Sequence, residues 1–194
     1  MKKLTRQDLF SLESYAKMRA EFRARVMAHK KDRQVAIGQH ATLYFEDALT
    51  VQYQVQEMLR VERIFEEDGI LAELEAYNPL IPDGGNLKAT FMLEYPDLAE
   101  RQQALALLVN VEDRVWLRVE GCAAVWSAAD EDLERETAEK TSSVHFLRFE
   151  LTPAMVKAVK QGAGIGMGID HPAYRYGIDA VPASVRRSLA ADLD

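Results

Sequence analysis

Residues 47–67, DALTVQYQVQEMLRVERIFEE, form the longest uninterrupted helical pattern of the chain. At about 100° per residue, one side of such a helix is largely apolar, with Leu59 beside it. That side comprises Val51, Val55, Met58, Glu62 and Phe65. Glu62 therefore stands where an aliphatic residue is expected, and an unpaired buried charge costs roughly several kcal/mol. We predict a long central helix whose buried carboxylate is paired, protonated or bound to a metal ion.

Two interpretations of Glu62 follow from this position. In the first, a strand arginine such as Arg148 or Arg118 neutralises the carboxylate inside the core, as structural ion pairs do. In the second, Glu62 is a metal ligand or a general base. The sequence alone leaves both interpretations open.

The chain has four histidines, and they bear on the metal interpretation. His29, His40, His145 and His171 show none of the short spacings typical of metal sites, such as His-x-x-x-His. A metal site therefore requires that folding brings Glu62 together with His40, His145 and His171. Iron, manganese or zinc would suit such ligands. No motif predicts a cofactor, and the catalytic residues stay unknown because no phosphate loop, dinucleotide fingerprint or nucleophile elbow occurs.

The remaining pattern predicts the fold class. A second helix is expected from Leu12 to about Lys31, packed on the central helix, and short strand patterns occur in neighbouring pairs. Because strands and helices do not alternate regularly, we predict a single α+β domain over 1–194 with a mainly antiparallel sheet. Residues 127–140 are rich in acids and lack an apolar period, which predicts an exposed excursion.

Composition restricts the classes of protein. The 194 residues are 48% hydrophobic and carry a net charge of −7, which argues against a nucleic-acid-binding protein. No apolar run approaches the roughly 20 residues of a membrane span. The single cysteine, Cys122, excludes an internal disulfide framework and a cysteine-based metal cluster within one chain. A cytoplasmic location without membrane attachment is the resulting expectation.

One side of the first helix is basic. A solvated helix face explains this pattern, and binding of an anion or a polyphosphate is the alternative. The basic residues are Lys17, Arg23, Arg25, Lys30, Lys31 and Arg33.

Several stretches together resemble a known family. They are TLYFE at 42–46, QEMLRVERI at 56–64, YNPLIP at 77–82, TSSVHFLRF at 141–149 and DHPAY at 170–174. Over nearly its full length the chain resembles domain-of-unknown-function family 3501, a bacterial group without an established activity. The resemblance therefore identifies no catalytic residue.

Members of that family are often encoded beside rubrerythrin-like di-iron proteins and iron–sulfur oxidoreductase subunits. The resemblance thus implies an accessory protein that binds a redox partner, or its cofactor, in peroxide or electron-transfer chemistry. A metal-binding protein or metal-dependent enzyme built around Glu62 is the alternative. A homodimer is compatible with either function.

Overall fold

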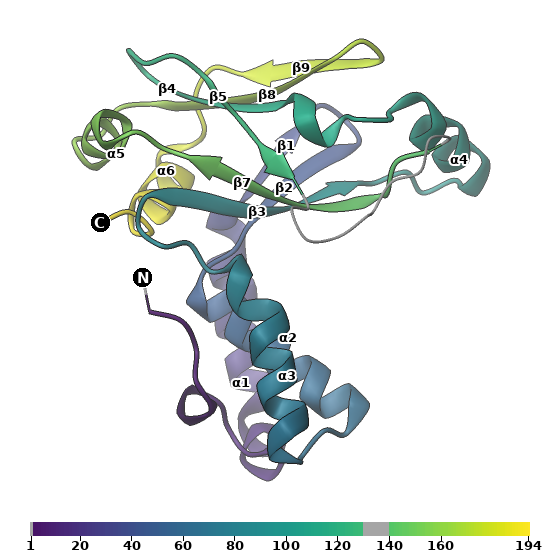
Figure 1. The fold of residues 1–194 in the computed structure, drawn as a ribbon, viewed down its shortest axis with the longest axis vertical. Coiled ribbons are helices and arrows are strands. Elements are labelled where there is room, and N and C mark those ends of the chain that lie inside the picture. The colour runs from purple at the N-terminus through teal and green to yellow at the C-terminus, as the bar shows by residue number, and fades with distance from the viewer. Residues whose placement is uncertain (1, 130–139) are drawn as a thin grey trace.

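The computed structural model describes residues 2–129 and 140–194 and confirms the predicted α+β class. Two antiparallel sheets face each other, and a helical arm extends from the outer side of one of them (Figure 1). One sheet has the strand order β1-β2-β3-β7-β6, and the other has the order β5-β4-β8-β9.

The element bounds agree with most of the predicted strands. The strands are β1 (Gln34–Ile37), β2 (Ala41–Phe45), β3 (Asn86–Leu93), β4 (Val115–Val119), β5 (Val125–Trp126), β6 (Ala128–Ala129), β7 (Val144–Glu150), β8 (Ile165–His171) and β9 (Tyr174–Ile178). The α-helices are α1 (Leu12–Lys30), α2 (Ala48–Glu62), α3 (Glu67–Tyr77), α4 (Leu98–Leu107), α5 (Pro153–Lys160) and α6 (Ala183–Ala190). Short 3-10 turns are η1 (Arg6–Asp8), η2 (Lys31–Arg33), η3 (Asn78–Leu80) and η4 (Glu112–Arg114).

The main core lies between the two sheets. Along β3 the buried side chains alternate with half-buried ones, so Leu87, Ala89 and Phe91 face the core. This alternation is the period of a strand with one face on the core, and it fixes the register with β2 and β7. Helices α5 and α6 close the same core with apolar residues such as Met155 and Leu189.

The arm consists of α1, α2 and α3, with α2 contacting both neighbours. One small core joins α2 to α3 through Val51, Val55 and Leu59, and another joins α2 to α1 through Tyr53. Because α2 is buried on two sides, its stability comes from packing more than from helix propensity. The predicted packing of the N-terminal helix on the central helix is confirmed.

The predicted extent and buried side of the central helix were partly wrong. The helix ends at Glu62, because Arg63 adopts a left-handed conformation with φ of 56°. Phe65 lies beyond the helix and is exposed, and Glu62 is exposed as well. In the last turn, Leu59 is buried instead. The next helix, α3, begins at Glu67.

The expected excursion at 127–140 was also partly wrong. Ala128 and Ala129 form β6, which pairs with β7. Residues 130–139 lie outside the part of the chain that the structure describes. The acidic residues that follow in the sequence therefore do not prevent Ala128 and Ala129 from joining the sheet.

The glycine-rich strand packs closely against an aromatic side chain. A Cβ atom on Gly168 would lie 2.3 Å from the ring of Trp116, which belongs to the neighbouring strand β4. The missing side chains therefore make room for an indole, as expected where a strand is approached at close range. The sequence did not indicate β9, which completes this sheet beyond β8.

A buried arginine joins the arm to the sheets. Arg33 is 2% exposed and pairs with Asp192, which follows α6, while its Nε lies 3.4 Å from Asp47 Oδ2. The guanidinium also donates to the carbonyl oxygens of Phe45 and Glu46, each at 3.0 Å. One cation therefore holds the base of α1, the N-cap of α2, the end of β2 and the segment after α6.

The two carboxylates around Arg33 differ in acidity. Burial raises the pKa of Asp192 to about 6, although Arg33 lies beside it. Burial would also raise the pKa of Asp47, but Arg33, the Thr50 amide and His29 together lower it. His29 Nε2 lies 2.5 Å from Asp47 Oδ2. Asp47 is therefore the better neutralised of the two acids that share Arg33.

A second polar cluster fastens α1 to α2 further along the arm. Arg19 forms a two-pronged pair with Glu57, with both N–O distances at 2.7 Å, and the Tyr15 hydroxyl donates to the same carboxylate at 2.6 Å. The hydrogen bond from Arg19, together with that from Tyr15, lowers the pKa of Glu57 to about 2.

We expect Arg33→Ala to lower the free energy of unfolding by about 3–5 kcal/mol, because it leaves buried acceptors and carboxylates without their cation. Urea unfolding followed by circular dichroism measures this change. The matched control is Arg23→Ala, which removes an exposed arginine of α1 and should change stability by less than about 0.5 kcal/mol. A loss of less than about 1 kcal/mol for Arg33→Ala would contradict this role.

We expect Glu57→Gln to destabilise the protein in a pH-dependent way. The pKa of Glu57 is lowered on folding, so its contribution is present above the unfolded value of 4.5 and is lost as the pH falls toward about 2. The free energies of unfolding of Glu57→Gln and of the unsubstituted protein, taken from unfolding curves, should therefore differ at neutral pH and converge at low pH. The control is Glu13→Gln, because Glu13 forms an exposed pair with Lys17 on α1. A difference that stays constant with pH would refute the ionic contribution.

Candidate functional site

Glu62 lies at the far end of the arm, away from the sheets. It is the last residue of α2 and is exposed, so the predicted burial of its carboxylate was wrong. The arginines proposed as its partners pair elsewhere: Arg148 with Glu150, and Arg118 with Asp179 at 3.5 Å. The physical reason is that the end of α2 packs only on the small core shared with α3, which buries Leu59 in the last turn and leaves Glu62 exposed.

The three candidate histidines occupy separate environments. His40 stacks on Tyr95 with a centroid separation of 4.2 Å. His145 is fully buried, with Nε2 at 2.8 Å from Thr141 Oγ1 and 3.6 Å from Glu112 Oε2. His171 is buried with Nε2 at 3.1 Å from the carbonyl oxygen of Val109. Each ring is thus oriented by its own set of neighbours.

The structure therefore does not bring the four predicted ligands together. Within 2–129 and 140–194, no three histidine, cysteine or acidic side chains are grouped so that they could hold a metal ion. The metal site stays a prediction, and the exposed position of Glu62 removes the observation that first suggested it.

The clearest surface feature is the end of the arm. We define the arm tip as Val61, Phe65 and Leu71, which are 66%, 71% and 48% exposed. These residues come from the end of α2, the connection between α2 and α3, and the start of α3. They lie close together in the sequence at one end of the arm, and contiguous exposed apolar surface, unlike single exposed side chains, marks interaction sites.

The segment that carries the arm tip is rich in acidic residues. Residues 60–75 contain six acidic side chains and two arginines. Burial, followed by the charge of the nearby Glu62, raises the pKa of Glu73 on α3. The surface thus offers apolar side chains within a negative rim.

Sequence reasoning missed this site because it placed Phe65 on a buried stripe. The signal that could have found it is the acidic run 66–68, which directly follows Phe65. An apolar residue within such a run is an unfavourable core position, since each neighbouring charge would require a partner.

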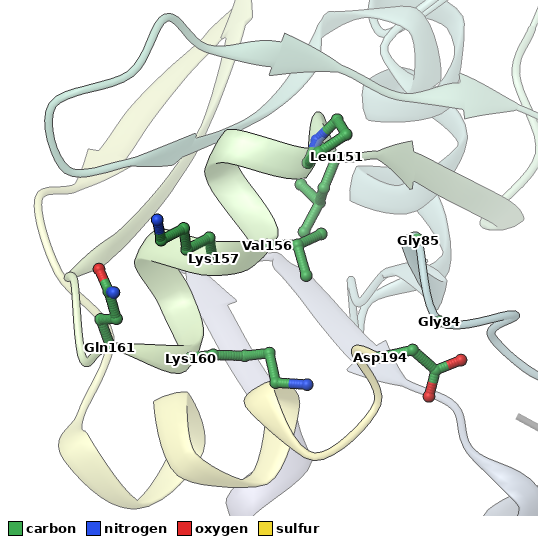
Figure 2. Close-up of a pocket in the computed structure, with 9 residues that line it drawn as sticks. Gly84, Gly85, Leu151, Val156, Lys157, Lys160, Gln161 and Asp194 are labelled. Atoms are coloured by element: carbon green, nitrogen blue, oxygen red, sulfur yellow. The ribbon is translucent and has the colours of Figure 1, made fainter.

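A hollow of about 560 Å³ lies beside α5 (Figure 2). Lys157 and Lys160 extend from α5, and Asp194 lies across from them near Gly84 and Gly85. The Lys160 ammonium already donates to the carbonyl oxygen of Leu193 at 3.3 Å. One of the two lysines of the hollow is therefore already engaged by the chain itself.

No described helix combines the length and the apolar character that a membrane span requires. This finding agrees with the absence of a long apolar run in the sequence.

We expect Glu62→Ala to change the free energy of unfolding by less than about 0.5 kcal/mol, because the side chain is exposed. The same preparation, purified without chelator, is suited to elemental analysis beside the unsubstituted protein. Stoichiometric iron, manganese or zinc that disappears in the variant would re-establish Glu62 as a ligand.

The comparisons with known proteins agree with the fold. No curated protein matches the chain. A crystal structure of a protein of unknown function from Burkholderia pseudomallei K96243 is similar, with 56% identity, a TM-score of 0.95 and coverage of 100% of both chains. The model of the family described as protein of unknown function (DUF3501) matches residues 3–193. The chain therefore belongs to the DUF3501 family.

Proposed function

We propose that this protein is an accessory protein that binds a protein partner through the arm tip. The observation that carries the proposal is the exposure of Val61, Phe65 and Leu71 at the end of a projecting arm. Phenylalanine is one of the aromatic residues that are enriched at protein–protein interfaces relative to the rest of the surface. The arm presents this group away from both sheets, where a partner has free access.

The charges around the tip indicate the chemistry of the partner. The acidic rim favours a surface with an apolar depression bordered by lysine or arginine, because complementary charges steer association and exclude wrong partners. A second copy of this chain docked tip to tip would bring two acidic rims together, and repulsion would oppose it. We therefore favour a different protein over a homodimer at this surface.

The family resemblance supplies the candidate partners. They are a rubrerythrin-like di-iron protein and an iron–sulfur oxidoreductase subunit, so the proposed role lies in peroxide or electron-transfer chemistry. Binding through the tip would place the accessory protein beside the redox protein without requiring a catalytic residue of its own.

The test is retention of these candidates at native expression levels. We expect the double variant Val61→Ser/Phe65→Ser to retain at least about ten-fold less partner, because a hot-spot residue contributes roughly 2 kcal/mol or more. Purified candidate proteins, titrated by calorimetry, confirm direct binding, and raising the ionic strength should weaken it.

The matched control is Leu107→Ser on α4. Leu107 is 68% exposed, so its removal reduces apolar surface to a similar extent at a different place. Equal retention by the tip variant and the unsubstituted protein would rule out the tip as the interface. Failure to find either redox protein would contradict the proposed class of partner.

A further inference from the structure

A cleft of about 550 Å³ lies where the arm meets the outer face of the five-stranded sheet. Met27 and Lys30 line it from α1, Val51 from α2 and Leu80 from η3. Figure 1 shows that the arm leaves the sheet on the side away from β8 and β9, so the cleft is separate from the main core. The volume is within the range of small-molecule sites, roughly 300–1,000 Å³.

The floor of the cleft is formed by two rows of side chains across the sheet. The strand register places Thr90 between Tyr44 and Phe146, and it places Met92 beside Val144. These residues alternate with the core-facing ones, so they belong to the outer face of the sheet. An outer face is normally polar, whereas this one carries half-buried apolar side chains that the arm covers incompletely.

The carboxylate in the cleft is already satisfied. Glu46 accepts a hydrogen bond from the Thr50 hydroxyl at 2.6 Å and another from the Thr90 hydroxyl at 2.8 Å. The Tyr44 hydroxyl donates a hydrogen bond to Glu94 at 3.1 Å. Burial is the main cause that raises the pKa of Tyr44, and the negative charge of Glu94 is the second. These groups therefore hold the shape of the floor and leave little capacity to bind a cationic ligand.

The lysines in the cleft are in the opposite situation. The ammonium groups of Lys30 and Lys31 have no hydrogen-bond or ion-pair partner among the described residues. Their position at the end of α1 is favourable to the helix dipole, which accounts for basic residues there but not for their place at an apolar cleft. In a chain with a net charge of −7, this lining has two cations and one engaged carboxylate.

We propose that this cleft binds an amphipathic organic anion, with its apolar body on Met92 and Phe146 and its carboxylate or phosphate at Lys30 and Lys31. Met27 and Met92 suit such a body, because unbranched thioether side chains adapt to irregular ligand shapes. The lysines supply charge without the fixed fork of arginine, so either a carboxylate or a phosphate can be accommodated. This site is independent of the arm tip and of partner binding.

The experiment uses the full chain with ¹³C-methyl-labelled methionine, observed by NMR. Decanoate, decyl phosphate and the neutral decanol are titrated separately below the concentrations at which they aggregate. We expect at least one anion to shift the Met27 and Met92 signals saturably, with decanol binding about ten-fold or more weakly, a difference of about 1.4 kcal/mol. The anion with the higher affinity identifies a carboxylate or a phosphate as the preferred head group.

Two variants decide whether the lysines select the anion. Lys30→Gln/Lys31→Gln should reduce the affinity for the anion to that for decanol, whereas Lys17→Gln should leave it unchanged. Lys17 is exposed on the same helix and pairs with Glu13, so it is a matched control. No saturable shift with either anion, equal binding of decanol, or shifts confined to Met18 and Met58 on the arm would overturn the proposal.

Discussion

The arrangement of the molecule depends on the buried guanidinium of Arg33. The arm and the sheets have separate apolar cores, so hydrophobic packing alone leaves the angle between them weakly determined. Arg33 donates hydrogen bonds to the end of β2 and to Asp192 after α6, and it forms an ion pair with the N-cap Asp47 of α2. Because an unsatisfied buried charge is costly, these parts fit together in an arrangement that satisfies all the partners at once.

This constraint also maintains the cleft. A tighter junction would bury the apolar outer face of β3 and β7 completely, and a looser one would open it to solvent. The hydrogen bonds of Glu46 to Thr50 on α2 and to Thr90 on β3 span the same junction, so they hold α2 at a fixed distance from the sheet. The cleft is therefore a consequence of polar contacts that keep two apolar surfaces apart.

The sequence predicted the elements better than it predicted their environment. The helical pattern predicted from Leu12 was sufficient for α1, and the short strand patterns were sufficient for strands such as β3, because each element buries one continuous face. The end of α2 could not be predicted, because the residue that adopts the left-handed conformation there is Arg63. A glycine at this position would have indicated the end of the helix. Arg33 and Asp192 are 159 positions apart in the sequence, so the spacing of residues within one helix or strand could not predict their contact.

The same limit explains why Glu62 was misinterpreted while the arm tip was missed. Periodicity gives the side of a helix but not how far its packing partners extend along it. The contacts of α2 with α1 and α3 bury residues up to Leu59, and beyond that turn the same stripe emerges into solvent. Glu62, the last residue of α2, is therefore exposed, and Phe65 is exposed in the connection to α3 that follows the left-handed Arg63. The length of the supporting helices, not the amphipathic pattern itself, thus decides where core ends and interaction surface begins.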